Sequence, residues 1–339
     1  MYGEISYKEI EEGSLKGSTV LVDVRTREEF LESTIPNSIN IPIMTEDERA
    51  EIGRIYVQED VKKAKRLGIK VGSQKLPQIY LDIENLYNQY DNVVIFCARG
   101  GYRSKSVFYI MKSMGFNIYK LKGGYKEYRK YINENLPMII DRARFVVLSG
   151  KTGCGKTKIL KKLEDMGKLV LDLEGYANHR GSLLGDVGLG SQNSQKMFES
   201  LVYHKLKSDQ DGIFFTEGES KRIGRIVMPE YMYKKISSSK TILIDSPIEH
   251  RVKNILEDYV NNTDKELIER LGLLTNHISK RKIDGMIEDI NYGDYQKVIR
   301  ELMENYYDIN YNLPSEYDYE IMNFNEEETA KRILEIIDC

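Results

Sequence analysis

The chain has 339 residues, enough for two domains of ordinary size, and its 41% hydrophobic and 30% charged residues are typical of a soluble globular protein. A formal net charge of −3 gives no global field that would attract a nucleic acid, so basic regions must be local. Three scattered cysteines, Cys97, Cys154 and Cys339, and four histidines argue against a disulfide framework and against a zinc site. The N-terminal stretch has no apolar signal core, and no apolar run approaches the ~20 residues that span a bilayer, so we expect a cytoplasmic, reduced protein without membrane contact.

The first part of the chain, residues 1–138, has the pattern of a parallel α/β domain. Buried strands are predicted at Val20–Val24 and Asn92–Phe96, with helical stretches between them. Residues 44–90 are mostly helical and polar, and we interpret them as an insertion. The insertion serves either as a lid or docking surface or as extra packing, and the sequence leaves these alternatives open.

The second strand leads into a loop that is rich in glycine and arginine. The strand ends at Cys97, and a helix is predicted from Ser104 onward. A helix N-terminus and two cations, Arg99 and Arg103, favour the nucleophilic thiolate form of Cys97. The alternative is a buried structural cysteine, which needs neither the glycines nor the arginines. We therefore predict a catalytic Cys97 in an anion cradle made of Gly100, Gly101, Tyr102 and Ser104.

This domain resembles the rhodanese-type sulfurtransferases, in which such a cysteine carries sulfur. The resemblance includes Leu21–Arg25, the turn Ile35–Pro42 and the closing segment Gly115–Tyr128. Tyr128 stands where many rhodaneses have Trp. Five residues separate Cys97 from Arg103, one more than in the common small rhodaneses, and this longer loop is similar to that of dual-specificity phosphatases. A wider cradle fits a tetrahedral oxyanion better than a bare sulfur.

A basic stretch follows the loop. Residues 99–130 contain nine Lys or Arg and a single acid, Glu127. Five tyrosines are interleaved with them: Tyr102, Tyr109, Tyr119, Tyr125 and Tyr128. The stretch is either an ordinary solvated face or a phosphate-binding face with aromatic rings that stack on bases.

The second domain, residues 139–339, begins after a boundary near Glu134–Pro137 and opens with a complete P-loop motif. An apolar strand, Phe145–Ser149, precedes Gly150–Thr157, and a helix is predicted to follow. Such a loop wraps phosphate oxygens with backbone N–H groups, while its lysine reaches the terminal phosphates and its hydroxyl binds Mg²⁺. The predicted phosphate-binding residues are Gly150, Thr152, Gly153, Gly155, Lys156 and Thr157.

Polar residues follow the next three predicted strands, which are Lys168–Leu173, Gly212–Thr216 and Thr241–Asp245. Ligands of open α/β sheets bind at the carboxyl ends of the strands, so these residues are candidates for a substrate site. They are Asp172, Glu174, Asn178, His179, Arg180, Glu217, Glu219, Ser220, Arg222, Arg225 and Arg251. Glu217 or Glu219 would be the second Mg²⁺ anchor beside Thr157. A lone His179 would more often be structural, but beside these acids, the amide and the arginine we favour a role in the site. From Asn261 onward we predict a helical region that ends in a helix, Glu326–Ile337.

Together and in this order, the two domains resemble the tRNA 2-selenouridine synthases. The specific segments are Cys97–Ser104, Gly150–Thr157, Asp172–Ser182 without Tyr176, and Glu219–Gly224. The resemblance implies a rhodanese-like parallel-sheet domain followed by a P-loop NTPase-like α/β domain with a helical C-terminal region. It also implies replacement of the sulfur of a wobble 2-thiouridine by selenium from selenophosphate, after geranyl diphosphate has alkylated that sulfur.

The implied partners are the anticodon loop of a tRNA and a protein that supplies selenophosphate. We expect the P-loop to bind the diphosphate and the Cys97 loop to carry the selenium step. Both sites are expected to open onto one basic surface that includes the stretch 99–130, and the residues chosen for tRNA binding are Lys122, Lys126 and Lys221 with Arg222 and Arg225. The alternatives are an ATP-dependent tRNA sulfurtransferase or kinase that uses a Cys97 persulfide, and a non-catalytic module whose P-loop only stabilises the fold.

Overall fold

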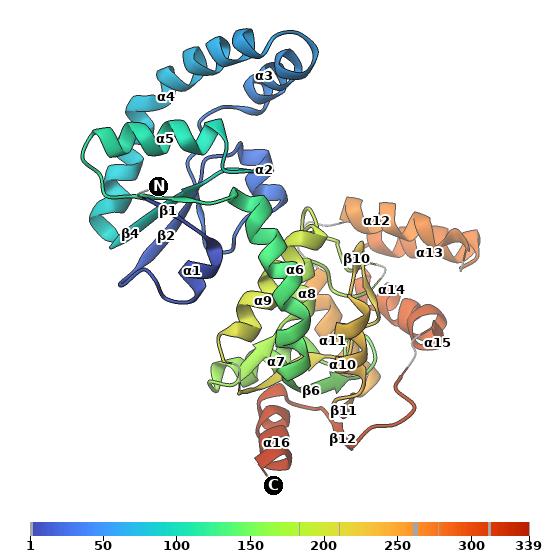
Figure 1. Ribbon diagram of the computed structural model, residues 1–339. Helices are drawn as coiled ribbons and strands as arrows, with labels where there is room; N and C mark the ends of the chain where they lie inside the picture. Colours follow the sequence, from blue (N-terminus) through green and yellow to red (C-terminus); the bar gives the residue numbers. More distant parts are fainter. Residues whose placement is uncertain are drawn as a thin grey trace. The chain divides into compact units, whose positions relative to one another are not determined.

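The structure is a computed structural model, and it describes residues 3–182, 184–209, 211–259, 264–276, 278–310 and 313–338 (Figure 1). The chain forms two compact units, one of residues 1–136 with 199–201 and one of residues 137–198 with 202–339. Each unit contains a five-stranded sheet whose strand pairs are all parallel. The predicted α/β fold class is therefore confirmed. Two residues named in the sequence analysis lie outside the described residues: Asn261, where the predicted helical region begins, and Cys339.

The sheet of the first unit has the strand order β1-β5-β4-β2-β3. Its strands are β1 (Glu4–Ile5), β2 (Thr19–Asp23), β3 (Ile39–Asn40), β4 (Asn92–Phe96) and β5 (Tyr119–Leu121). Its helices are α1 (Tyr7–Glu11), α2 (Arg27–Glu32), α3 (Glu46–Gln58), α4 (Val61–Gln89), α5 (Tyr102–Ser113) and α6 (Gly124–Arg142). The central strand β4 is buried along its whole length, as its apolar sequence predicts.

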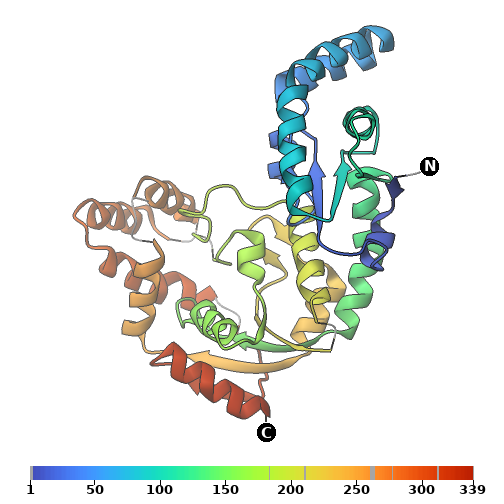
Figure 2. The same cartoon turned by 90° about the vertical axis from the view of Figure 1, so that its left-hand side faces the viewer.

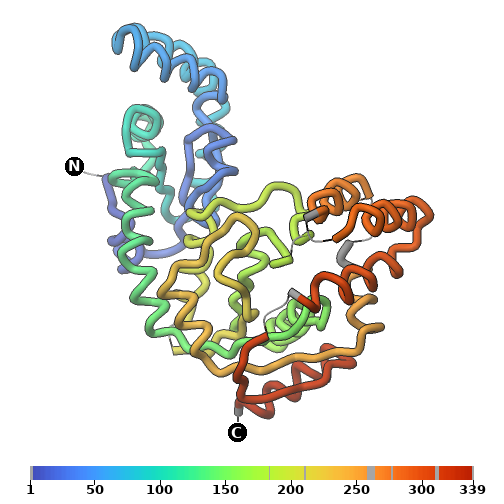
Figure 3. Tube along the Cα trace, turned by 90° about the vertical axis from the view of Figure 1, so that its right-hand side faces the viewer, coloured from blue at the N-terminus to red at the C-terminus, as the bar shows by residue number. Residues whose placement is uncertain are grey.

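The insertion predicted at residues 44–90 consists of the two helices α3 and α4. Thr45 and Glu48 form a capping box at the start of α3, and the Asp60 side chain caps α4. Only two residues, Glu59 and Asp60, separate the helices, so α3 and α4 form an antiparallel hairpin, and they lie side by side in Figure 2 and Figure 3. Much of the first half of α4 is exposed, whereas Ile79, Ile83 and Leu86 in its second half pack into the core.

Helix α6 runs through the predicted domain boundary at Glu134–Pro137 as far as Arg142 and contains Pro137 in its interior. Proline removes one helical hydrogen bond and usually ends or kinks a helix. Ile132, Leu136 and Ile140 are all buried on this helix, and their packing keeps the segment helical.

The sheet of the second unit has the order β12-β11-β6-β8-β7. Its strands are β6 (Arg144–Ser149), β7 (Leu169–Leu171), β8 (Ile213–Glu217), β11 (Lys240–Asp245) and β12 (Tyr319–Met322), and a separate hairpin contains β9 (Arg222–Ile223) and β10 (Ile226–Val227). The helices are α7 (Lys156–Asp165), α8 (Leu173–Ala177), α9 (Gln195–Lys207), α10 (Glu230–Ser237), α11 (Ile248–Tyr259), α12 (Asp264–Gly272), α13 (Lys280–Asn291), α14 (Tyr295–Leu302), α15 (Asp308–Asn310) and α16 (Glu326–Asp338). A 3₁₀ turn, Leu273–Asn276, and a π-helical turn, Met303–Tyr307, complete the unit.

Two expectations for this unit are wrong in detail. The C-terminal region is not purely helical, because β12 pairs with β11 as the fifth strand. This edge strand has only four residues and only Ile321 is buried, so it is too short to show a strand periodicity in the sequence. The strand predicted at Lys168–Leu173 is limited to β7, since the Asp172 side chain accepts the N–H of Gly175 and starts α8. Among the described residues, no helix is both long enough and apolar enough to cross a membrane.

Candidate functional site

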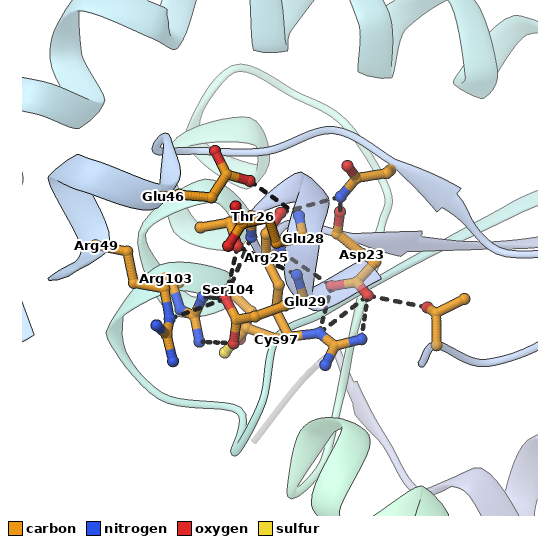
Figure 4. A network of polar contacts seen from close by, with 12 residues as sticks. Asp23, Arg25, Thr26, Glu28, Glu29, Glu46, Arg49, Cys97, Arg103 and Ser104 are labelled. Atoms are coloured by element: carbon orange, nitrogen blue, oxygen red, sulfur yellow. Dashed lines mark hydrogen bonds and ion pairs between the residues drawn. The ribbon is translucent and has the colours of Figure 1, made fainter. Parts of the chain in front are cut away.

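Cys97 lies directly after strand β4, at the carboxyl end of the strand, where the chain turns into α5. The side chain is 3% exposed, and its Sγ lies 3.1 Å from the hydroxyl of Ser104 in the first turn of α5 (Figure 4). Gly100 has φ +63°, which favours glycine, and Gly101 is the N-cap of the helix. Cys97, Gly100, Gly101 and Ser104 are thus brought together as predicted, with the sulfur close to the N-terminus of a helix.

A second turn, Gly123–Gly124, holds this loop by its backbone. Tyr125 N–H donates to the carbonyl of Cys97 and Lys126 N–H to that of Ala98, both at 2.9 Å. Gly124 has φ +61°, and a Cβ atom at this position would lie 2.1 Å from the carbonyl oxygen of Cys97. Only a glycine permits this close approach, so the turn after β5 fixes the shape of the loop after β4.

A network of ion pairs flanks the cysteine (Figure 4). Arg103 binds Glu29 through both guanidinium nitrogens, and Arg49 lies 3.2 Å from the same carboxylate. Burial opposes ionisation of Glu29, but its hydrogen bond to Arg103 and the arginine's charge outweigh it and lower the pKa of Glu29. Burial likewise acts against charged Arg103, but the hydrogen bond to Glu29 and the charge of that carboxylate raise the pKa of Arg103. Arg103 is therefore held as a cation beside the sulfur.

The other two residues predicted for this loop face outward. Arg99 is exposed, and Tyr102 is 64% exposed with the Lys65 ammonium 4.8 Å from its ring centroid. In the stretch 99–130, Lys122 and Lys126 are exposed, but Tyr125 and Tyr128 are buried. The expectation that all five tyrosines are free to stack on bases is therefore wrong for these two, which fill the core.

The P-loop follows β6, and three side chains frame its backbone from outside. Arg251 Nε donates to the carbonyl of Thr152, Asn254 Nδ2 to that of Gly153 and Asn323 Nδ2 to that of Cys154, each at 2.9 Å. Across a trans peptide, a carbonyl and the next N–H point in opposite directions. The frame therefore turns the N–H groups of Gly153 and Gly155 away from Arg251 and Asn323. Lys156 Nζ lies 2.6 Å from the carbonyl of Gly150 across the loop.

The expectation that Arg251 faces the phosphates is wrong in this structure. Its guanidinium is buried and binds both carboxylate oxygens of Asp308, at 2.9 and 2.6 Å, in addition to Thr152. Arg251 thus supports the P-loop from behind. Asn254, Asn323 and Asp308 complete this frame and were not predicted, because nothing in their local sequence indicates this role.

Carboxylates gather beside the P-loop at the ends of β7 and β8. The Thr157 hydroxyl donates to Glu174 at 3.3 Å, and Glu174 and Glu219 are hydrogen-bonded to each other. Burial and the nearby Glu219 charge raise the pKa of Glu174 to about 8, and burial raises the pKa of Glu219 against the opposing charge of Lys156. One proton shared by this pair relieves the repulsion.

Glu217 lies at the buried end of β8 beside this pair. Its Oε2 accepts the N–H of Leu173 at 3.3 Å, while Oε1 has no hydrogen-bond partner among the described residues. Burial, followed by the charges of Asp172 and Glu174, raises the pKa of Glu217 well above its usual range. Glu217 Oε1 and the Thr157 hydroxyl are hard oxygen donors of the kind Mg²⁺ prefers, and a bound cation would favour the ionised form of Glu217, so these two residues fit the ion. No cluster of three or more His, Cys, Asp or Glu in the described part of the chain could hold a metal by itself.

The loop after α8 is mainly structural. Asn178 adopts a left-handed conformation, and its amide donates to the carbonyls of Leu189 and Ser191 at 2.9 and 3.0 Å. His179 is buried, and burial lowers its pKa, so the ring is neutral at pH 7. Cβ atoms built on Gly185 and Gly224 would lie 2.8 and 2.6 Å from this ring, which shows how tightly it packs. His179 therefore matches the structural alternative.

The remaining predicted residues lie on the loop and hairpin after β8. Ser220 Oγ donates to the carbonyl of Arg222 at 2.6 Å, and Arg222 is exposed. The Arg225 guanidinium donates to the carbonyl of Gln192, and Lys221 pairs with Glu230. Arg225 and Lys221 are thus engaged within the unit, and their proposed contact with tRNA stays a prediction.

A cavity of about 720 Å³ opens over the P-loop. Its lining includes the P-loop residues Thr152–Lys158 and, of the predicted substrate site, Asp172, Glu174, Arg180, Glu219 and Ser220. A narrow apolar crevice adjoins it, and the two share Thr152, Ser182, Ile255 and Tyr307. The crevice is otherwise lined by Leu184, Leu267, Tyr295, Val298, Ile299, Leu302 and Met303.

Comparisons with known proteins match both units. Residues 6–131 match the model of the rhodanese-like domain, and residues 143–291 match that of the tRNA 2-selenouridine synthase AAA domain. The tRNA 2-selenouridine synthase of Bdellovibrio bacteriovorus is 33% identical over 76% of this chain and 70% of its own length. The chain belongs to the tRNA 2-selenouridine synthase family. The resemblance stated from the sequence is thereby confirmed.

Other relatives of this family match less of their own length. The tRNA 2-selenouridine synthase of Nitrosomonas europaea is 32% identical, and the match covers 72% of this chain but 64% of that relative. The chain thus spans less than two thirds of that relative's length. A solved structure from Clostridium difficile 630, the N-terminal domain of a protein described as ATP/GTP-binding, is 42% identical over 38% of this chain and 98% of its own, with a TM-score of 0.35.

Gly124→Ala should destabilise the protein. The left-handed φ alone costs an alanine about 1–2 kcal/mol, and the clash with the Cys97 carbonyl adds to it, so we expect a loss of at least about 2 kcal/mol in the free energy of unfolding. Urea denaturation measures it. Gly101→Ala is the matched control, because its φ is −86° and a Cβ atom there meets nothing within 4 Å. Equal stability of the two variants would contradict the close approach.

Glu174→Gln should stabilise the protein more at pH 8 than at pH 5. The native state keeps a proton on Glu174 up to about pH 8, whereas the unfolded chain releases it near pH 4.5. Stability is therefore lost as the pH rises between these values, and glutamine removes that loss. Melting temperatures at both pH values measure it, with the exposed Glu328→Gln as control. An advantage that is independent of pH would contradict the raised pKa.

Proposed function

We propose that this protein converts a wobble 2-thiouridine of tRNA into 2-selenouridine, with selenium from selenophosphate and an S-geranylated intermediate made from geranyl diphosphate. Family membership supports the tRNA substrate and the selenium chemistry. The structural observation that supports the geranyl step is the apolar crevice that continues the P-loop cavity. A partner protein would supply the selenophosphate.

The cavity and the crevice together suit an anion with an apolar tail. The P-loop presents backbone N–H groups and Lys156 to phosphate oxygens, while Ile255, Val298 and Leu302 offer an aliphatic surface directly beside it. The crevice has a volume of only about 30 Å³, less than a geranyl chain needs, so the chain would bury apolar area there by moving the lining side chains apart. The ribose hydroxyls of a nucleotide would need polar partners there, so this lining favours a prenyl diphosphate over ATP.

In the first step, the thiouridine sulfur attacks the carbon that bears the diphosphate. The sulfur–carbon bond forms as the carbon–oxygen bond breaks, and diphosphate leaves with the negative charge. Lys156 and the N–H groups of the framed loop stabilise this charge. Mg²⁺, which Thr157 and Glu217 would hold, supplies further neutralisation of the diphosphate when bound. S-alkylation releases the N3 proton of the base, and the carboxylate that stays ionised in the Glu174–Glu219 pair is the candidate acceptor.

In the second step, selenium replaces the alkylated sulfur at carbon 2. We assign this step to the Cys97 loop, because the helix N-terminus and Arg103 provide a cradle for a selenophosphate-sized anion. Alkylation makes the sulfur a better leaving group, and it departs as geranylthiol. Cys97 acts there as part of the cradle, or as a nucleophile whose sulfur bonds to phosphorus as the phosphorus–selenium bond breaks. The selenide that is released attacks carbon 2, and water then cleaves the sulfur–phosphorus bond to free phosphate. If selenophosphate attacks carbon 2 directly, water cleaves the phosphorus–selenium bond afterwards. That both sites open onto one basic surface stays a prediction.

Two substitutions should separate the two steps. Lys156→Ala should reduce geranylation by ~10²–10³ in rate, by analogy with other lost transition-state donors, without unfolding the protein. Cys97→Ser should leave geranylation intact and abolish formation of 2-selenouridine. The assay incubates thiolated tRNA with geranyl diphosphate and selenophosphate and quantifies nucleosides by mass spectrometry, with Lys331→Ala on α16 as control.

Other outcomes of the same assay decide against the proposal. Full selenation by Cys97→Ser would leave the loop as an anion site only. ATP hydrolysis that is lost in Lys156→Ala, with no geranylation by the unsubstituted protein, would favour the ATP-dependent sulfurtransferase or kinase. A Lys156→Ala variant that unfolds would favour a P-loop that only stabilises the fold.

Ile299 variants should change the preferred length of the prenyl chain. Ile299 lines the crevice from α14, so Ile299→Phe narrows it and Ile299→Ala widens it. We expect Ile299→Phe to lower kcat/KM for geranyl diphosphate relative to dimethylallyl diphosphate by about tenfold or more. Ile299→Ala should instead favour farnesyl diphosphate. The ratio of kcat/KM for two substrates in one variant does not depend on how much of the protein is folded. If these ratios do not change, the prenyl tail binds elsewhere.

A further inference from the structure

The first half of α4 carries an unusual charge pattern. Residues 61–81 contain six Lys or Arg and no acid. Lys62, Arg66 and Lys70 follow one another at a spacing of four, which places them on one face of the helix over about 12 Å. All three side chains are exposed.

Most of the nearby acids are engaged elsewhere. Glu59 binds Arg54 and Lys63, each at 2.6 Å, and Glu48 binds Lys75. Within the described residues, Lys62, Arg66 and Lys70 make no ion pair. An uncompensated basic face of this kind attracts a polyanion, whereas paired lysines on the same helix do not.

This basic face reaches the Cys97 loop. Lys65, on the adjoining side of α4, lies over the ring of Tyr102, the first residue of α5. The exposed Arg99 lies within the loop itself, and Lys105 is exposed one turn further along α5. The cations of α4 thus continue into those of the loop, and the exposed Tyr102 ring lies where they meet.

The stretch 99–130 cannot serve as the whole RNA face. Lys120 and Arg129 are buried, as are Tyr125 and Tyr128. Lys120 also forms an ion pair with Glu4 at 2.9 Å. The exposed cations of the stretch are Arg99, Lys105, Lys122, Lys126 and Lys130, and Lys130 pairs with Glu127 and Glu134. The cations of α4 extend this set within the same unit.

We propose that the basic face of α4, formed by Lys62, Arg66 and Lys70, binds the sugar–phosphate backbone of tRNA together with the adjoining Lys65, next to the part of the RNA that carries the modified base. The identity of the RNA rests on the proposed function. Lysine and arginine contacts to phosphates fix position without reading sequence. Tyr102 then offers a ring on which an unstacked base packs as it enters the Cys97 loop. The α3–α4 insertion is accordingly a docking surface.

The test is the salt dependence of tRNA binding by the full-length protein. A triple variant, Lys62→Gln, Arg66→Gln and Lys70→Gln, removes three phosphate contacts. We expect at least tenfold weaker binding of thiolated tRNA near 0.1 M salt, and a slope of log K against log salt that is shallower by about 2–3. Geranyl diphosphate binding should not change, because these residues lie in the other unit from the P-loop.

The matched control is Lys234→Gln, Lys253→Gln and Lys331→Gln, which removes the same charge from exposed positions of the second unit. It should retain the slope. The proposal is overturned if the α4 variant binds tRNA like the unsubstituted protein, or if the control weakens binding equally. Failure of the unsubstituted protein to bind any tRNA would instead overturn the proposed function.

Discussion

The hydrogen bonds that fix the peptide groups of the P-loop are the interaction on which the second unit depends. Arg251 and Asn254 from α11 and Asn323 from the end of β12 occupy three successive carbonyls. Their donors lie 99 to 169 residues away along the chain, so the anion site forms only when distant segments have packed together. Asp308 holds Arg251 in turn. A phosphate site of this kind is preorganised, because the protein has already oriented its dipoles before the ligand arrives.

In the first unit, glycines fix the shape of the anion-binding loop. The Cys97 loop is held by the Gly123–Gly124 turn through backbone contacts too close for any side chain. Arg103 is locked by Glu29 and cannot swing away from the sulfur. In both units, an anion would therefore meet a rigid backbone and fixed cations at the carboxyl ends of parallel strands. This is where open α/β sheets bind their ligands.

The sequence was sufficient to predict structure where the pattern lies within one short segment. The P-loop, β4 with Cys97 and the helix after it combine an apolar strand, glycines and a helix start within about a dozen residues, and all were predicted correctly. The packing between distant segments could not be predicted from the sequence. The edge strand β12 has one buried residue, Tyr128 looked available to RNA but is buried, and Arg251 looked like a phosphate ligand but supports the loop from behind. Each of these outcomes depends on contacts between distant segments.

The central claim is that the P-loop cavity takes a diphosphate with an apolar tail. Isothermal titration of the full-length protein with geranyl diphosphate, inorganic diphosphate and ATP, each with Mg²⁺, tests it most directly. The account predicts that geranyl diphosphate binds at least about 100-fold more tightly than inorganic diphosphate, because the crevice buries the chain, and more tightly than ATP. Equal affinity for geranyl and inorganic diphosphate, or tighter binding of ATP, would contradict it.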